Sequence, residues 1–275
     1  MLLKLKQFLK VLILDISTNP NEITLLVGIA FFIAGIVKGV IGIGLPTTAI
    51  TIMTFFISPL TALGLNLIPM TVSNIWQFSK ADNYKALFND YKYFAFFLFI
   101  FIFITSFYAN IVGDNLVRLM FAFVVISFVT VNFFGLNFRI NPKHDRFWQG
   151  GLGSIGGLIG GVVSIWAVPV TMYLLMKNVK PKQFVDVSGF LIMVGCIPIS
   201  FGYISTGVFQ PNMFIYGALG SLTAVMGFQL GAKLRNRLNA QTFKNLLLLF
   251  FSLAALKMVI QSLIEFDIFK EISLI

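Results

Sequence analysis

The sequence predicts an all-α, polytopic membrane protein with two inverted-topology repeats of about five segments each and a broken or re-entrant helix at the start of each repeat. Of its 275 residues, 58% are hydrophobic and 11% are charged, and the mean hydropathy is +0.92. Apolar stretches such as 93–108, 119–134 and 246–264 approach the roughly 20 residues that a helix needs to cross a bilayer. Their unbroken character favours helices over the alternating pattern of barrel strands.

The first 21 residues are expected to form an amphipathic helix that lies in the membrane interface. Leu9, Leu12 and Ile16 recur at helical spacing. Asp15 interrupts the apolar part and no small-residue cleavage site follows it, which disfavours a secretory signal peptide. An interfacial helix fits this pattern better.

An internal duplication predicts the two repeats. It is visible when GIVKGVIGIGLP is set above GLIGGVVSIWAVP: Gly35 meets Gly157, and one inserted residue brings Pro46 onto Pro169. Because each copy holds an odd number of segments, the second copy must enter the membrane upside down. The expected segments are 22–42, 45–57, 60–79, 92–110 and 115–135 in the first repeat, and 149–164, 167–177, 183–205, 212–232 and 243–264 in the second.

Loop charges test this inversion independently, because Lys and Arg collect on the cytoplasmic side of a membrane protein. In the first half the basic residues lie in the middle loop, whereas in the second half they lie in the first and third loops. They are Lys80, Lys85 and Lys92, and then Lys177, Lys180, Lys182, Lys233, Arg235, Arg237 and Lys244.

The resulting organisation has five regions, with both termini outside the cell. They are an amphipathic interfacial segment (1–21), the first transmembrane repeat (22–135), a cytoplasmic linker (136–148), the second transmembrane repeat (149–264) and a C-terminal tail (265–275).

Several function classes are disfavoured by composition. The formal net charge of +10 sits mostly in short loops and forms no single basic and aromatic patch, so nucleic acid is not an expected partner. Cys196 stands alone, which excludes an internal disulfide and a CxxC metal pair. His144 lies in the polar linker, and no HExxH or paired acidic motif occurs. We therefore expect no catalytic residues, no metal and no cofactor.

The two short segments after the Gly-rich stretches point to a binding site. At 1.5 Å per residue, 45–57 and 167–177 do not span about 30 Å comfortably, so they are expected to end inside the membrane. Proline suits the first turn of a helix, which makes Pro46 and Pro169 the expected restart points. A helix that restarts at depth directs unpaired N–H groups and about half a positive charge into the protein. Secondary transporters use such discontinuous helices as anion sites, so a small-anion carrier is predicted.

Lys38 strengthens this hypothesis. A lysine at mid-membrane costs about 2.5–3.5 kcal/mol on insertion scales and marks a candidate functional site, although its long stem could also snorkel to an interface. The other candidate residues near the interruptions also have structural alternatives. Their hydroxyl groups could instead hydrogen-bond to their own helices, and the aromatic side chains could serve packing. The Gly-rich stretches have glycines spaced by four, which could serve close helix contact. The candidate substrate-binding residues are Lys38, Gly42, Gly44, Pro46, Thr47, Thr48, Asn66, Ser164, Trp166, Pro169, Thr171 and Tyr173.

The two Gly-rich segments GIVKGVIGIGLP and GLIGGVVSIWAVPVTMYLL, with the turn at Lys180-Pro181, resemble the sulfite exporter TauE/SafE family over about residues 22–264. The resemblance implies a bacterial cytoplasmic (inner) membrane transporter of small, often sulfur-containing anions, such as sulfite, thiosulfate, sulfonates or related organic acids. Ser164 and Trp166 stand where the first copy has Gly42 and Gly44, so the two halves are not expected to contribute equally.

This resemblance sets the expected partners and leaves alternatives to the transport mechanism. The partners are the anionic solute, a coupling proton or sodium ion, and membrane lipid. Alternating access is the expected mechanism. An anion channel, which would use the same helix dipoles and lysine, and a membrane assembly subunit without transport activity are the alternatives.

Overall fold

The computed structural model describes residues 19–134, 140–234 and 240–272, and all regular secondary structure in these ranges is helical, as predicted. Residues 1–18, where the interfacial helix was expected, lie outside the described residues, as do Arg235 and Arg237. The helices are α2 (Pro20–Ile41), α3 (Leu45–Met53), α4 (Pro59–Phe78), α5 (Tyr84–Ser106), α6 (Ala109–Phe134), the short 3-10 helix η1 (Pro142–His144), α7 (Asp145–Val163), α8 (Ala167–Met176), α9 (Pro181–Ser205), α10 (Met213–Leu234) and α11 (Ala240–Ile272).

Five helices in the described ranges are long and apolar enough to cross a membrane, which supports the predicted polytopic class. The long helices α4, α7 and α11 are not among the five. α4 carries the buried polar side chains of Asn66, Ser73, Asn74 and Gln77, which lower its hydropathy. The five candidate spans are Pro20–Ile41, Tyr84–Ser106, Ala109–Val131, Lys182–Ser205 and Met213–Leu234.

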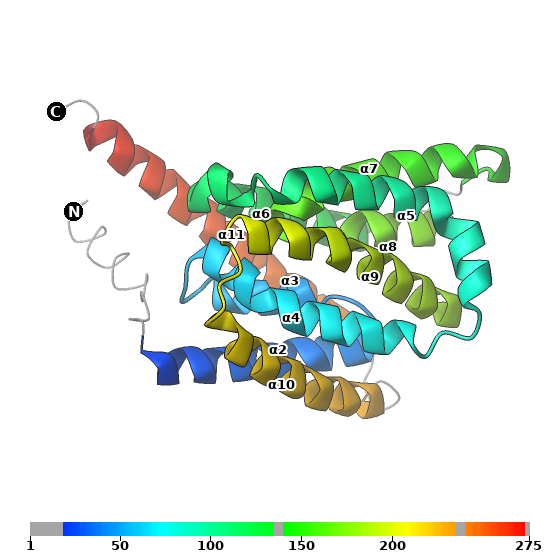
Figure 1. Cartoon of the computed structure of the whole chain (residues 1–275), viewed down its shortest axis with the longest axis horizontal. Coiled ribbons are helices and arrows are strands. Elements are labelled where there is room, and N and C mark those ends of the chain that lie inside the picture. The colour runs from blue at the N-terminus through cyan, green and yellow to red at the C-terminus, as the bar shows by residue number, and fades with distance from the viewer. Residues whose placement is uncertain (1–18, 135–139, 235–239, 273–275) are drawn as a thin grey trace.

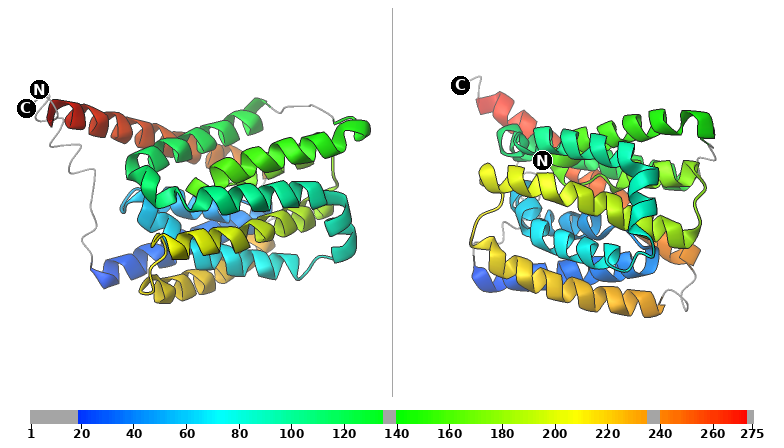
Figure 2. Two further views of the ribbon diagram at one scale, coloured as in Figure 1. Left: turned by 45° about the horizontal axis from the view of Figure 1, so that its top comes forward. Right: turned by 45° about the vertical axis from the view of Figure 1, so that its right-hand side comes forward.

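The helices form three layers (Figure 1). α2 and α10 lie side by side at the bottom of the view, α4 and α9 cross the middle, and α5 and α7 lie at the top; the same neighbours recur in both views of Figure 2. α4 packs against α10 below it, and α9 packs against α5 above it. α6 and α11 form a further pair. α2 and α7, the first helices of the two broken pairs, therefore lie in opposite outer layers, whereas α3 and α8 lie between these layers, behind α4 and α9 in the view of Figure 1.

Glycines set the close approach of the two outer helix pairs. A Cβ added at Gly35 of α2 would meet the carbonyl oxygen of Ala224 in α10, and a Cβ added at Gly157 of α7 would lie 2.9 Å from the carbonyl oxygen of Leu98 in α5. Only glycine lets these backbones approach so closely. Close helix packing, which the sequence offered as the alternative role of these glycines, is thus the role seen in the structure.

Most expected segments correspond to helices, but several boundaries differ by four residues or more. α5 begins at Tyr84 instead of 92, because the Asn83 side chain accepts a hydrogen bond from the Ala86 N–H at 2.9 Å and caps the helix. α7 begins at Asp145, within the predicted linker, because an acidic residue in the first turn interacts favourably with the helix dipole. α11 continues to Ile272, into the predicted tail.

Candidate functional site

The first interruption separates α2 from α3. Gly42 and Gly44 have φ angles of 97° and 98°, a left-handed conformation that glycine adopts without strain. The Gly42 N–H closes α2 on the Lys38 carbonyl oxygen at 2.7 Å. Pro46 lies in the first turn of α3, where a missing N–H loses no helical hydrogen bond. Because Gly42 and Leu45 are buried, the N-terminus of α3 begins inside the protein.

The second interruption separates α7 from α8 and has different chemistry. Ser164 takes the role of Gly42: its φ is 59°, and its N–H closes α7 on the Gly160 carbonyl oxygen at 2.8 Å. Trp166 does not repeat Gly44, because its φ is −119°. Pro169 is the third residue of α8, again within the first turn. Both interruptions thus restart a helix with proline, but the second is closed by a strained serine and a buried tryptophan.

The Trp166 ring is held tightly by small residues. A Cβ added at Gly195 of α9 would lie 2.6 Å from ring atoms of Trp166, and one added at Gly160 would lie 3.0 Å away. The ring is therefore fixed between α7 and α9, next to the start of α8. The indole Nε1 is buried and has no hydrogen-bond partner among the described residues.

Lys38 is buried and turns towards α4. Its exposed fraction is 2%, so its side chain is enclosed by protein. Nζ donates to Asn74 Oδ1 at 2.8 Å and to Ser73 Oγ at 3.2 Å. Both acceptors are oriented, because Asn74 Nδ2 and Ser73 Oγ donate to the Met70 carbonyl oxygen. The ammonium is therefore held by neutral groups, and no ion pair to it is formed within the described residues.

Asn66 links α4 to the second interruption. Its side chain is fully buried, and Nδ2 approaches Ser164 Oγ at 3.5 Å. Further along the same helix, Gln77 Nε2 donates to the Val185 carbonyl oxygen at 2.8 Å and approaches Ser188 Oγ at 3.4 Å, both on α9. α4 thus contacts Lys38 beside the first interruption, Ser164 at the second, and the start of α9.

Ser73, Asn74 and Gln77 were not among the predicted site residues. The spacing of Asn66, Ser73, Asn74 and Gln77 is i, i+7, i+8, i+11, which places all four on one face of a helix. That pattern is present in the sequence and would have identified a polar face on α4.

Several of the predicted site residues carry buried polar atoms without a hydrogen-bond partner in the described part of the chain. Thr48 and Thr171 are both in this state, and each stands two residues after the restart proline of its helix. Thr47 is buried beside Thr48. An unpaired buried polar group costs about 1–3 kcal/mol, so such groups are rare and commonly mark a place where water or a ligand binds. The unpartnered atoms are Thr48 Oγ1, Thr51 Oγ1, Asn66 Oδ1, Gln77 Oε1, Asn115 Oδ1, Trp166 Nε1 and Thr171 Oγ1.

Tyr173 lies at the far end of α8 in a different polar cluster. Its hydroxyl donates to Asp145 Oδ1 at 2.8 Å, and Lys177 Nζ donates to Asp145 Oδ2 at 3.0 Å. Gln149 Nε2 also donates to Asp145, at 2.8 Å. Partial burial alone would raise the pKa of Asp145, but the hydrogen bonds from Gln149, Lys177 and Tyr173 outweigh it and hold that pKa below its usual value. This cluster ties the end of α8 to the start of α7.

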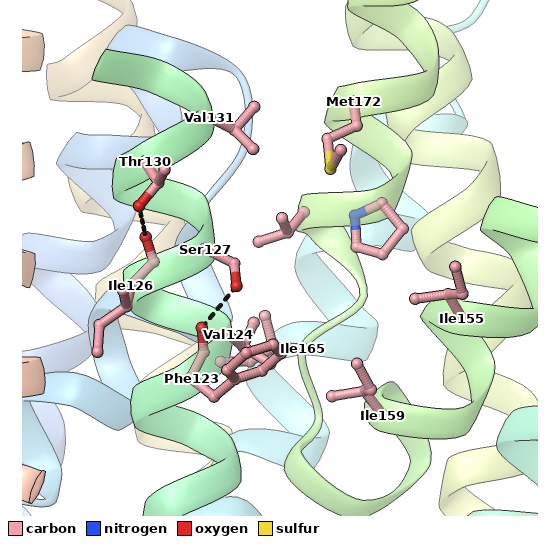
Figure 3. Close-up of a pocket in the computed structure, with 12 residues that line it drawn as sticks. Phe123, Val124, Ile126, Ser127, Thr130, Val131, Ile155, Ile159, Ile165 and Met172 are labelled. Carbon is pink, nitrogen blue, oxygen red and sulfur yellow. Dashed lines mark hydrogen bonds between the residues drawn. The ribbon is translucent and has the colours of Figure 1, made fainter. Parts of the chain in front are cut away.

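A cavity of about 380 Å³ lies between α6 and the α7–α8 pair (Figure 3). Pro169 forms part of its wall. The hydroxyl groups of Ser127 and Thr130 line it, but they donate to the carbonyl oxygens of Phe123 and Ile126 at 2.8 Å. The rest of the lining is apolar, so this cavity offers an anion little polar contact.

No cluster of three or more His, Cys, Asp or Glu side chains suited to a metal ion occurs among the described residues. Cys196 is buried, with its thiol directed to the Ile192 carbonyl oxygen at 3.3 Å.

Comparison with known proteins identifies one family. The family model described as sulfite exporter TauE/SafE matches residues 27–258, from within α2 to within α11, and so includes both interruptions. No curated protein and no solved structure matches the chain.

Proposed function

The chain belongs to the sulfite exporter TauE/SafE family, and from that premise we propose that it is a secondary transporter of small, sulfur-containing anions that works by alternating access. Membership makes it a multi-pass membrane protein and an anion transporter, and it confirms that the chain is not an enzyme, because this is a transporter family. The substrates we propose are sulfite, thiosulfate, sulfonates or related organic acids. The bacterial cytoplasmic membrane is the proposed location.

We further propose that α2–α6 and α7–α11 are inverted repeats, and the helix packing supports this. α2 packs against α10 as α7 packs against α5, and α4 packs against α10 as α9 packs against α5. α4 pairs with α9, and α6 pairs with α11. Exchanging each helix for its counterpart in the other half reproduces these contacts. Two halves related in this way can alternate between outward- and inward-facing arrangements around one central site.

The observation that carries the proposal is the pair of buried helix restarts surrounded by unpartnered polar atoms. The N-termini of α3 and α8 offer unpaired N–H groups and partial positive charge. Thr48 and Thr171, at matching positions after the two prolines, offer hydroxyl groups without partners among the described residues. Trp166 Nε1 offers a further donor. A sulfur oxyanion, whose oxygen atoms accept several hydrogen bonds at once, matches a set of donors of this kind.

Lys38 supplies the charge of the proposed site. Its ammonium is held by Asn74 and Ser73, both neutral, so a bound anion would be its counter-ion. Burying a cation without an anionic partner costs several kcal/mol, so binding of an anion beside Lys38 would be favourable. In this arrangement Asn74 and Ser73 are positioning residues, because they orient the ammonium without needing to contact the anion.

Flux measurements in proteoliposomes test the proposal. Purified full-length protein would be assayed with sulfite, thiosulfate, taurine, sulfoacetate, sulfate and lactate, with imposed proton or sodium gradients to identify the coupling ion. We expect saturable counterflow of at least one sulfur-containing anion. Unsaturable flux at ion-channel rates would contradict the carrier mechanism and favour a channel. Absence of both flux and anion binding would favour an assembly subunit.

A further inference from the structure

Two cations lie close to one tyrosine ring where α5 and α7 pack together. Lys92 Nζ lies 5.6 Å from the centroid of the Tyr93 ring, and Arg146 Cζ lies 5.4 Å from the same centroid. Both cationic residues are exposed. In the described part of the chain neither forms an ion pair, whereas Lys177 and Lys182 are paired with Asp145 and Asp82.

The position of these cations on their helices matches the edge of a membrane. After Lys92 the chain carries no charged residue until Asp114, and after Arg146 it carries none until Lys177. Each cation therefore stands where its helix passes from polar to apolar sequence. In Figure 1 the starts of α5 and α7 lie at the same end of the bundle, at the right. Cations and aromatic rings at this depth lie at the level of lipid headgroups.

An apolar side chain completes the patch. Phe147 follows Arg146 directly, is 75% exposed, and meets the Trp148 ring edge-on at a centroid distance of 6.2 Å. An exposed phenylalanine next to Arg146 in the chain combines contact for an acyl chain with contact for a phosphate. Two carboxylates are near in sequence: Asp90, whose backbone carbonyl oxygen accepts a hydrogen bond from Gln149, and Asp145, which is paired with Lys177.

We propose that Lys92, Tyr93, Arg146 and Phe147 form a binding site for one anionic glycerophospholipid at the start of the α5–α7 pair. The two cations bind the phosphodiester, the Tyr93 ring packs against both of them, and Phe147 contacts the first part of an acyl chain. The ligand is a membrane lipid and not free phosphate, because half of the site is apolar. The site is separate from the proposed anion-transport site, so either can fail without the other.

The amount of lipid that the purified protein retains tests the proposed lipid site directly. Full-length protein would be purified in mild detergent with phosphatidylglycerol or phosphatidylcholine, and bound lipid would be counted by native mass spectrometry. The test variant is the double substitution Lys92→Ala and Arg146→Ala. The matched control is Lys143→Ala with Lys180→Ala, which removes the same charge from exposed positions outside the site.

We expect native protein to retain phosphatidylglycerol in preference to phosphatidylcholine. The test variant should retain about tenfold less phosphatidylglycerol, because each of the two basic residues strengthens binding of an anionic lipid several-fold. The control is expected to change by less than about twofold. Addition of glycerol 3-phosphate should not displace the lipid. Equal losses in both double variants, equal retention of the two lipids, or displacement by glycerol 3-phosphate would each overturn the proposal.

Discussion

The two helix interruptions differ in what they provide. The first, at Gly42 and Gly44, is built from glycine and stands one turn after Lys38, so it combines backbone freedom with a buried charge. The second, at Ser164 and Trp166, carries no charge and is closed by a tryptophan ring packed against glycines. In the proposed site, the first half would therefore contribute the charged group, and the second half would contribute a rigid wall formed by the Trp166 ring.

The far ends of the short helices differ in the same way. α8 ends in the cluster of Asp145, Tyr173 and Lys177, which joins it to the start of α7. α3 ends near Phe55, whose carbonyl oxygen accepts a hydrogen bond from Lys257 of α11 at 3.3 Å. α8 is therefore fixed within its own half, whereas α3 is fixed to the other half.

The largest expected effect tests the charge in the first half. Lys38→Met should reduce anion affinity by about 10- to 100-fold, because a hydrogen bond to a charged group contributes about 1.5–3 kcal/mol. Isothermal titration of purified protein with the transported anion measures it. Lys143→Met, which removes an exposed lysine, is the control and should bind normally. Unchanged affinity in Lys38→Met would remove Lys38 from the site.

Glycine substitutions test whether the halves pack equivalently. Gly35→Ala and Gly157→Ala should each destabilise the protein by about 1–3 kcal/mol, because the added Cβ would meet the backbone of α10 or α5. Gly28→Ala and Gly151→Ala, where the added Cβ meets nothing within 4 Å, are the matched controls. Thermal unfolding in detergent compares all four. A loss of stability for only one of the two substitutions would mean that the α2–α10 and α5–α7 pairs are not equivalent.

The backbone at the interruptions predicts a smaller, asymmetric effect. Gly42→Ala should destabilise the protein by about 1–2 kcal/mol, because a side chain disfavours its φ of 97°. Ser164→Gly should be neutral or mildly stabilising, because it relieves the same kind of strain. Similar destabilisation by both substitutions would show that the Ser164 side chain matters more than its backbone.

The smallest expected effect concerns the Asp145 cluster. Asp145→Asn should lower stability by less than about 1 kcal/mol, because the pair with Lys177 is partly exposed. Since the folded-state pKa of Asp145 is lowered, its contribution is present above the unfolded-state pKa of about 3.9 and is lost as the pH falls further. The melting temperatures of the two proteins should therefore converge at low pH. A difference that persists there would assign the effect to packing.

The sequence predicted the helical class and the positions of the two interruptions because both depend on local properties. Glycine and proline at Gly42, Pro46 and Pro169 act on the backbone where they stand, and apolar length alone marks a membrane span. The partners of Lys38 could not be predicted in the same way. Ser73 and Asn74 reach it only because α4 packs beside α2–α3, and that contact is set by the tertiary fold.

The position of Tyr173 is also set by the tertiary fold and could not be predicted from the sequence. The sequence makes it a candidate substrate-binding residue, because it follows the second interruption. In the structure it lies two turns along α8, with its hydroxyl on Asp145. By contrast, Thr48 and Thr171 could be found from the duplication alone, because each occupies the same position relative to its restart proline.

The central claim is that one anion binds between the starts of α3 and α8, with the ammonium of Lys38 as its counter-ion. An experimental structure of the protein with thiosulfate, in which anomalous scattering locates the sulfur atoms, tests it most directly. We predict sulfur density within hydrogen-bonding reach of Thr48 and Thr171. Sulfur density confined to the apolar cavity beside α6, or at a site away from both interruptions, would contradict it.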